Sequence, residues 1–146
     1  MNSKAAMSSE LRKLVEERVE RTLKGIEDTL RRILESQEVS LIDLKEDIQS
    51  LEESFNLLSQ KWDLEILYIL FLKITCSFNE LKKILGVNSR TLSDKLKTLK
   101  RYGYIERIVE TGPPLRVKYT LTTKGKNTAL LALPLLYYSS SSTPLK

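Results

Sequence analysis

The 146-residue sequence contains no histidine and a single cysteine, Cys76. A zinc site of Cys and His ligands within one chain is therefore excluded, and so is an intrachain disulfide. One unpaired cysteine is typical of reducing, intracellular settings, and we expect Cys76 to be a buried small apolar residue rather than a reactive thiol. The sequence predicts no metal and no cofactor.

Long apolar runs are also missing. The longest is 129–138, which Pro134 interrupts, and it is well short of the roughly 20 residues that a membrane-spanning helix needs. The first ten residues lack the apolar core of a signal peptide. We therefore expect a cytoplasmic protein that has no membrane partner.

The motifs of common catalytic sites are absent as well. The sequence has no glycine-rich phosphate loop, no nucleophile elbow and no histidine to act as a general base. A catalytic role would have to rest on Cys76 or on isolated carboxylates without a visible base. The sequence therefore predicts that the protein is not an enzyme.

The charge of the chain is unevenly distributed. Residues 1–60 hold 9 Lys or Arg and 13 Asp or Glu, whereas residues 61–127 hold 14 and 6. The overall net charge of +5 thus hides an acidic first segment and a second segment of net charge +8. Such an asymmetry points to nucleic acid as the partner of the second segment.

The first sixty residues have the periodicity of an amphipathic helical arm. From Leu41 to Leu58 the apolar residues alternate at spacings of three and four, which is the seam of a coiled coil. No proline occurs before Lys61, so we expect one long helix or two helices that break near 37–40, where Ser40 can cap a new start. A helix packed on its own domain is the alternative to a dimerising coiled coil. The predicted dimer contacts of this arm are Leu23, Leu30, Leu34, Leu41, Leu44, Ile48, Leu51, Phe55 and Leu58.

Residues 61–85 are predicted to form two helices with a brief strand, "ITCS", between them. The helix over 61–73 is apolar around most of its circumference, so we expect it at the centre of a core, with Trp62 packed there. The helix over 78–85 has one apolar side. Its inward-pointing residues are expected to be Leu81, Ile84 and Leu85.

A turn, a second short helix and a hairpin follow. Gly86 is expected to end the preceding helix and Asn88 to cap the next one, which Gly103 ends. Strands of alternating character flank the Gly112-Pro113-Pro114 tip, and a last helix starts at Thr122 or Thr123 and runs to about Tyr138. Two short helices joined by a tight turn and followed by a hairpin are typical of a winged helix-turn-helix.

The predicted fold class is therefore mainly α with a small β-hairpin wing (α+β), a winged helix-turn-helix preceded by a long N-terminal helical, coiled-coil arm. We predict a dimerisation arm over 1–60, a DNA-binding domain over 61–126 and a C-terminal dimerisation helix over 127–138. A tail of disordered composition is predicted over 139–146.

The second helix of this motif, 89–102, is the predicted recognition helix for the major groove of double-stranded DNA. At ~100° per residue, its cationic residues lie nearly opposite the stripe of Leu92, Leu96 and Leu99. Arg90 is the candidate for a bidentate contact to guanine. A solvated basic face on a structural helix is the alternative. The predicted DNA contacts of this helix and its cap are Asn88, Ser89, Arg90, Thr91, Ser93, Asp94, Lys97 and Arg101.

Asp94 and the wing complete the predicted interface. Three roles are possible for Asp94 on this face: it accepts a hydrogen bond from a cytosine, it orients Arg90, or it repels DNA sites of the wrong sequence. The wing is predicted over 107–121, where Arg116 and Lys118 are expected to reach the adjacent minor groove or its phosphates.

Residues 61–126 contain a set of short motifs that together are fairly specific. They are Lys61-Trp62, Phe78-Asn79-Glu80-Leu81, Ser89-Arg90-Thr91-Leu92, Gly103 before "YIER", and "PPLRVKYTLTTKG". By these motifs the sequence resembles the HxlR-type winged helix-turn-helix transcription regulators of the wider MarR-like group. The resemblance implies a homodimeric repressor or activator that recognises a roughly palindromic operator. It also implies that the last helix, 123–138, joins the dimer interface, so Leu130 and Leu133 are predicted dimer contacts.

The sequence departs from that family in two places. Many members carry a cysteine just before the Lys-Trp pair, used in some cases to sense oxidants, whereas this chain reads "FNLLSQKW" there. The N-terminal segment is also longer than the family's usual lead-in, and its seam suggests a reinforced or an alternative dimerisation arm. The sequence identifies no small-molecule effector. An architectural DNA-binding protein of weak specificity, and a protein-interaction module with the winged helix as scaffold, are the alternatives.

Overall fold

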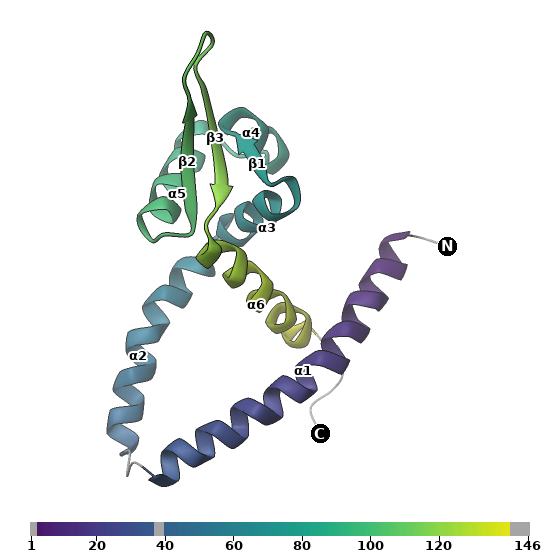
Figure 1. Ribbon diagram of the computed structural model, residues 1–146, viewed down its shortest axis with the longest axis vertical. Coiled ribbons are helices and arrows are strands. Elements are labelled where there is room, and N and C mark those ends of the chain that lie inside the picture. The colour runs from purple at the N-terminus through teal and green to yellow at the C-terminus, as the bar shows by residue number, and fades with distance from the viewer. Residues whose placement is uncertain (1–2, 37–39, 141–146) are drawn as a thin grey trace. The chain divides into compact units, whose positions relative to one another are not determined.

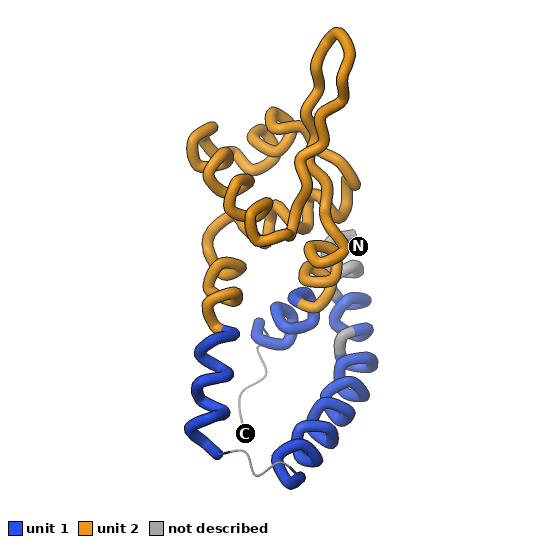
Figure 2. Tube along the Cα trace, turned by 60° about the vertical axis from the view of Figure 1, so that its left-hand side comes forward, with its two compact units in different colours: residues 1–51, 132–146 blue, residues 52–131 orange. Residues whose placement is uncertain are grey.

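The computed structural model describes residues 3–36 and 40–140, which form six helices and three short strands (Figure 1). The chain divides into two compact units, residues 1–51 with 132–146, and residues 52–131 (Figure 2). In chain order the elements are α1 (Ser3–Ser36), α2 (Leu41–Leu58), α3 (Asp63–Lys73), β1 (Thr75–Ser77), α4 (Phe78–Leu85), α5 (Ser89–Arg101), β2 (Ile105–Glu110), β3 (Arg116–Leu121) and α6 (Thr123–Ser139).

The predicted mainly helical fold with a β-hairpin wing is confirmed. The strands form one antiparallel sheet in the order β1-β3-β2, so the predicted hairpin of β2 and β3 is joined by the brief strand β1. Arg107 of β2 lies opposite Tyr119 of β3, and Cys76 of β1 lies opposite the same tyrosine on the other side. These three residues therefore share one face of the sheet, since directly paired residues point the same way.

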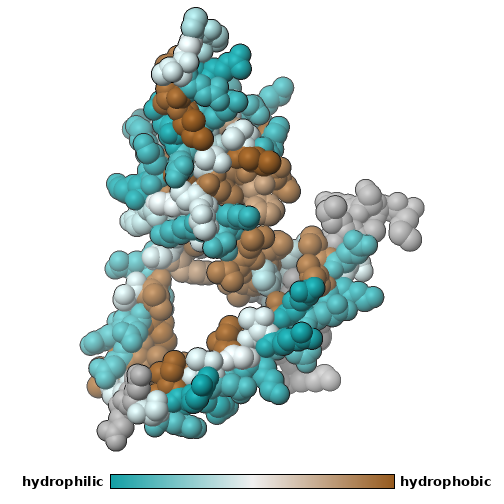
Figure 3. All heavy atoms as spheres, in the orientation of Figure 1, coloured by the Kyte–Doolittle hydropathy of each residue, from teal (hydrophilic) through white to brown (hydrophobic). Residues whose placement is uncertain are grey.

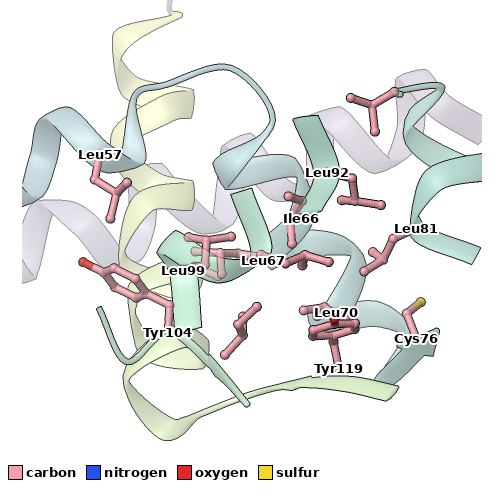
Figure 4. Close-up of a cluster of buried hydrophobic side chains, with 14 residues drawn as sticks. Leu57, Ile66, Leu67, Leu70, Cys76, Leu81, Leu92, Leu99, Tyr104 and Tyr119 are labelled. Carbon is pink, nitrogen blue, oxygen red and sulfur yellow. The ribbon is translucent and has the colours of Figure 1, made fainter. Parts of the chain in front are cut away.

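The core of residues 52–131 is formed where α3 meets α4, α5 and the sheet (Figure 4). Ile66, Leu67 and Leu70 of α3 are at most 1% exposed, which confirms the central place predicted for this helix. Trp62 packs on the core but is only partly buried. The expectation that Ile84 points inward is wrong: its side chain is 50% exposed, because the short α4 turns only Leu81 fully and Leu85 partly toward the core.

The arm contains two helices, α1 and α2. Ser40 begins α2 as predicted, since its Oγ accepts a hydrogen bond of 3.1 Å from the backbone N–H of Asp43. The rest of the predicted break, 37–39, and the end of the predicted tail, 141–146, lie outside the described residues.

Apolar side chains run along α1 and α2 among hydrophilic ones (Figure 3). Of the predicted seam residues in the arm, Leu44 and Leu58 are half-buried, and Leu58 packs against the core of the second unit. The remaining seven are exposed in the single chain: Leu23, Leu30, Leu34, Leu41, Ile48, Leu51 and Phe55.

Candidate nucleic-acid interface

Local hydrogen bonds fix the ends of the two helices that form the helix-turn-helix. Ser77 and Glu80 make a capping box at the start of α4: the Ser77 Oγ accepts from the Glu80 N–H at 3.2 Å, and the Glu80 carboxylate accepts from the Ser77 N–H. The hydrogen bond from the Ser77 N–H to the carboxylate is the main cause that lowers the pKa of Glu80 below its ordinary value. Gly86 ends α4 in the left-handed conformation, at φ 66°.

Asn88 caps α5 as the sequence predicts. Its Oδ1 accepts a hydrogen bond of 2.8 Å from the Thr91 N–H. The turn between α4 and α5 is therefore only three residues long, and it presents the N-terminal end of α5 to solvent. That end is the part of a recognition helix that contacts base edges.

The two faces of α5 differ sharply. Leu92, Leu96 and Leu99 are at most 2% exposed and pack into the core. Ser93 and Thr91 are half-buried at the flanks of the outward face. The structure brings the other predicted residues of α5 and its cap together as exposed side chains on one surface: Asn88, Ser89, Arg90, Asp94, Lys97 and Arg101.

Asp94 lies on this outward face without a link to Arg90. Within residues 3–36 and 40–140, no ion pair or hydrogen bond joins the Asp94 carboxylate to that guanidinium. The Asp94 backbone carbonyl accepts from the Thr98 hydroxyl at 3.0 Å, one turn later in α5. The structure therefore gives no support to the role of orienting Arg90, and the two roles toward DNA remain predictions.

The wing residues Arg116 and Lys118 lie on a different face of the hairpin from Arg107. Side chains alternate along a strand, so Lys118 and Arg116 face away from the side that carries Tyr119. The Lys118 ammonium group lies 3.5 Å from the carboxylate of Glu110. The structure thus does not bring these two cations next to α5, although both remain on the wing.

A groove on the α5 side of the hairpin brings together cations that the sequence analysis missed. Lys100 of α5 and Arg107 of β2 line it beside the predicted contacts Ser93 and Lys97. We call this feature the basic groove; its volume is about 390 Å³. Arg107 lies two residues after the buried Ile105 in β2, so both side chains point to the same face of the sheet. This alternation is the sequence signal that could have placed Arg107 on the α5 side.

A buried ion pair holds the inner flank of α5. Lys95 Nζ lies 3.5 Å from Asp63 Oδ2 at the start of α3, and it also donates to the Gln60 side-chain oxygen at 2.8 Å. The Asp63 side chain is 0% exposed, and its Oδ1 has no hydrogen-bond partner among the described residues. Burial raises the pKa of Asp63, while the positive charge of Lys95 opposes that rise.

Cys76 is a core residue, as the sequence predicts. Its side chain is 1% exposed and points into the cluster of Figure 4 beside Leu81 and Tyr119. Burial raises the pKa of the Cys76 thiol, and the nearby Glu80 carboxylate raises it further, whereas Lys73 acts in the opposite direction. Cys76 is therefore disfavoured as a thiolate nucleophile.

Within residues 3–36 and 40–140, no three Asp, Glu, Cys or His side chains gather as a metal site would require. None of the described helices is both long and apolar enough to cross a bilayer.

A helix-turn-helix with an exposed, cationic second helix and a β-hairpin wing defines the winged helix-turn-helix class of DNA-binding proteins. The HxlR-like helix-turn-helix family matches residues 57–140, more than half of the chain. The chain belongs to this family. Its relatives are HTH-type transcriptional regulators rather than enzymes, in agreement with the prediction from the sequence.

Two relatives from Bacillus subtilis illustrate the match. The chain is 34% identical to the HTH-type transcriptional regulator YdzF over 77 residues, which are 52% of this chain and 71% of YdzF. It is 33% identical to the HTH-type transcriptional regulator YodB over 84 residues, 57% of this chain and 72% of YodB. The solved reduced form of YodB superposes with a TM-score of 0.57 at 26% identity, covering 66% of this chain and 96% of that one.

Proposed function

We propose that the protein is a homodimeric, sequence-specific transcription regulator that inserts α5 into the major groove of DNA. In this proposal Arg90 reads a guanine, and the neighbouring Ser89, Thr91 and Ser93 donate to bases or phosphates. Lys97 and Arg101, further along α5, bind phosphates. The wing lies on the adjacent backbone or minor groove.

The outward face of α5 is the observation that carries the proposal. Arg90 is exposed on the first turn after the Asn88 cap, where a recognition helix meets base edges. The leucines on the opposite side are buried, so the helix cannot rotate to hide its cations in the core. An exposed, rigidly packed helix of this kind supports base reading in addition to charge neutralisation.

Fluorescence anisotropy across a salt series tests the proposal. The full-length protein is titrated with a duplex from the promoter of its own gene and with a random-sequence duplex. We expect a steep loss of affinity with salt on both, and binding to the promoter about a thousand-fold tighter. Equal affinities would indicate an architectural DNA-binding protein, and no binding at low salt would refute DNA binding.

The variant Arg90→Ala is expected to bind the promoter about 1–3 kcal/mol more weakly, while its affinity for random DNA falls much less, because a bidentate contact to guanine is lost. Anisotropy on both duplexes at one salt concentration measures the difference. Arg101→Ala is the matched control, because it removes the same guanidinium group from the part of α5 that is proposed to bind phosphate. It should lower the affinity for both duplexes by the same factor. If Arg90→Ala loses the same affinity on both duplexes, Arg90 contacts a phosphate rather than a guanine.

The proposed dimer uses the exposed apolar seam of the arm. Leu30 is 48% exposed and Leu51 is 71% exposed in the single chain, at spacings that suit a partner helix. A second copy of the chain offers the same seam, as a two-fold interface requires. On α6, Leu130 is 43% exposed and Leu133 is half-buried, which supports an additional contact there.

The double variant Leu30→Asp, Leu51→Asp is expected to weaken the dimer at least ~100-fold, since two leucines lose a burial worth about 1.5–3 kcal/mol each. Light scattering coupled to size exclusion measures the mass over a dilution series. Ser36→Asp with Gln49→Asp, both at exposed polar positions, adds the same charges outside the seam and should leave the dimer intact. A seam variant that stays dimeric would move the main contact to α6.

A further inference from the structure

The basic groove has the charge of an anion site. Its lining includes Ser93, Leu96, Lys97, Lys100, Arg107 and Tyr119, with no acidic residue. In the described part of the chain, none of the ion pairs includes Lys97, Lys100 or Arg107, the three cations of the groove. Three unneutralised positive charges around a single hollow produce a local potential that concentrates anions.

The floor of the groove strengthens that attraction. Leu96 is 2% exposed and Tyr119 is 9% exposed, so the base of the hollow is apolar and poorly hydrated. Lys100 and Arg107 line the same hollow and are exposed to solvent. Hydrogen bonds from charged donors are stronger where water is partly excluded, because the local dielectric is lower.

The cations of the groove come from two elements, α5 and β2, that would otherwise contact DNA separately. Ser93, Lys97 and Lys100 belong to α5, whereas Arg107 belongs to β2, which packs beside α5 (Figure 1). At ~100° per residue, Lys97 follows directly beside Arg90 on the helix surface, so the groove adjoins the proposed reading face. One ligand in the groove would therefore touch the recognition helix and the wing together.

We propose that the basic groove holds one phosphate of the DNA backbone where the duplex passes from α5 to the wing. Lys100 and Arg107 are positioning residues in this proposal: they fix the angle at which α5 enters the major groove, without reading a base. The groove offers a planar guanidinium, two ammonium groups and a hydroxyl, each of which can donate hydrogen bonds. A backbone phosphate only accepts hydrogen bonds, so the two match. The inference rests on the proposed function and adds a defined contact to it.

The variants Lys100→Gln and Arg107→Gln test the proposal in the full-length protein. Each removes one cation, so each should lower the slope of log affinity against log salt by about 0.9. At ~0.1 M salt that change corresponds to about eight-fold weaker binding for each variant. The loss should be equal on promoter and random duplexes, in contrast to Arg90→Ala. The double variant should lose about the same 0.9 in slope as each single variant, because the groove holds a single phosphate.

Lys126→Gln is the matched control. Lys126 is an exposed lysine that lines a different hollow, beside Phe71 and Thr120, on the other face of β3. This substitution makes the same change in net charge, so it should leave the salt slope and both affinities close to those of the wild type. Circular dichroism confirms that each variant keeps the helical content of the parent protein.

Three outcomes separate the proposals. If the wild type binds neither duplex at low salt, the proposed function fails. If the wild type binds but Lys100→Gln and Arg107→Gln behave like Lys126→Gln, the groove is not a phosphate contact and only this inference fails. If those variants bind DNA normally, and inorganic phosphate raises the melting temperature of the wild type but not of the double variant, the groove holds a free anion and the inference is overturned.

Discussion

The variant Lys95→Met is expected to lower the free energy of unfolding by about 3–5 kcal/mol, because it leaves Asp63 charged and buried without a partner. The Asp63 side chain is 0% exposed, one of its oxygens already lacks a partner among the described residues, and Lys95 provides the nearby positive charge. Lys95 itself is 19% exposed in its side chain, which favours the lower end of that range. Urea denaturation at neutral pH measures the loss.

The double variant Asp63→Leu, Lys95→Met is the control for that experiment. It removes both charges together, and replacing a buried pair by apolar residues of similar size is often neutral or stabilising. We therefore expect it to recover most of the stability that Lys95→Met loses. If the single variant is as stable as the wild type, the pair is not a structural link between α3 and α5.

The pH dependence of stability follows from the direction of the Asp63 shift. Burial holds the pKa of Asp63 above its ordinary value of 3.8, so the native state keeps this proton at pH values where the unfolded chain has released it. The contribution of this group to stability is therefore largest below that value and declines as the pH rises through the native pKa. In Lys95→Met the native pKa of Asp63 rises further, because the opposing positive charge is gone. The free energy of unfolding of this variant should therefore fall short of the wild-type value by less in acid than at neutral pH.

The variant Gly125→Ala is expected to destabilise the winged unit by about 3 kcal/mol, at the upper end of the usual cost of overpacking. A Cβ on Gly125 would collide with the backbone carbonyl of Tyr104 and approach the Leu121 side chain to 3.1 Å. The Tyr104 carbonyl cannot move away easily, since it accepts from the Thr122 N–H at 3.1 Å and its residue is 4% exposed. Thermal denaturation followed by circular dichroism measures the effect.

The same substitution at Gly25 is the matched control. Gly25 lies within α1, and a Cβ there meets nothing within 4 Å. Alanine is favoured over glycine in a helix by up to about 1 kcal/mol, so Gly25→Ala should keep or increase the helical signal. If Gly125→Ala is as stable as the parent, α6 does not need the close approach to Tyr104.

Most of the winged unit could be predicted from the sequence because its signals are local. The Gly86 stop, the Asn88 cap and the spacing of three leucines in α5 each depend on a few neighbouring residues, and each was found as expected. The inward place predicted for Ile84 failed because α4 has only eight residues. Which residues of so short a helix are covered depends on the elements packed against it rather than on its own period.

The basic groove and the buried ion pair could not be predicted in the same way. Lys100 and Arg107 are seven residues apart in the chain and on different elements, so their meeting depends on how β2 packs beside α5. Lys95 and Asp63 are 32 residues apart, and neither has a pattern that reveals the other. Asp63 in particular has the appearance of an ordinary first-turn acid of α3, which is usually solvated.

The place of β2 at the edge of the sheet has a consequence for the behaviour of the protein at high concentration. An edge strand offers backbone donors and acceptors to any other strand, and such edges are where chains associate wrongly. Here the six-residue strand carries Glu106, Arg107 and Glu110 as exposed charges. A foreign strand that paired there would bring its own side chains beside these charges, which disfavours edge-to-edge aggregation of the wing although Ile108 and Val109 are also exposed on the strand.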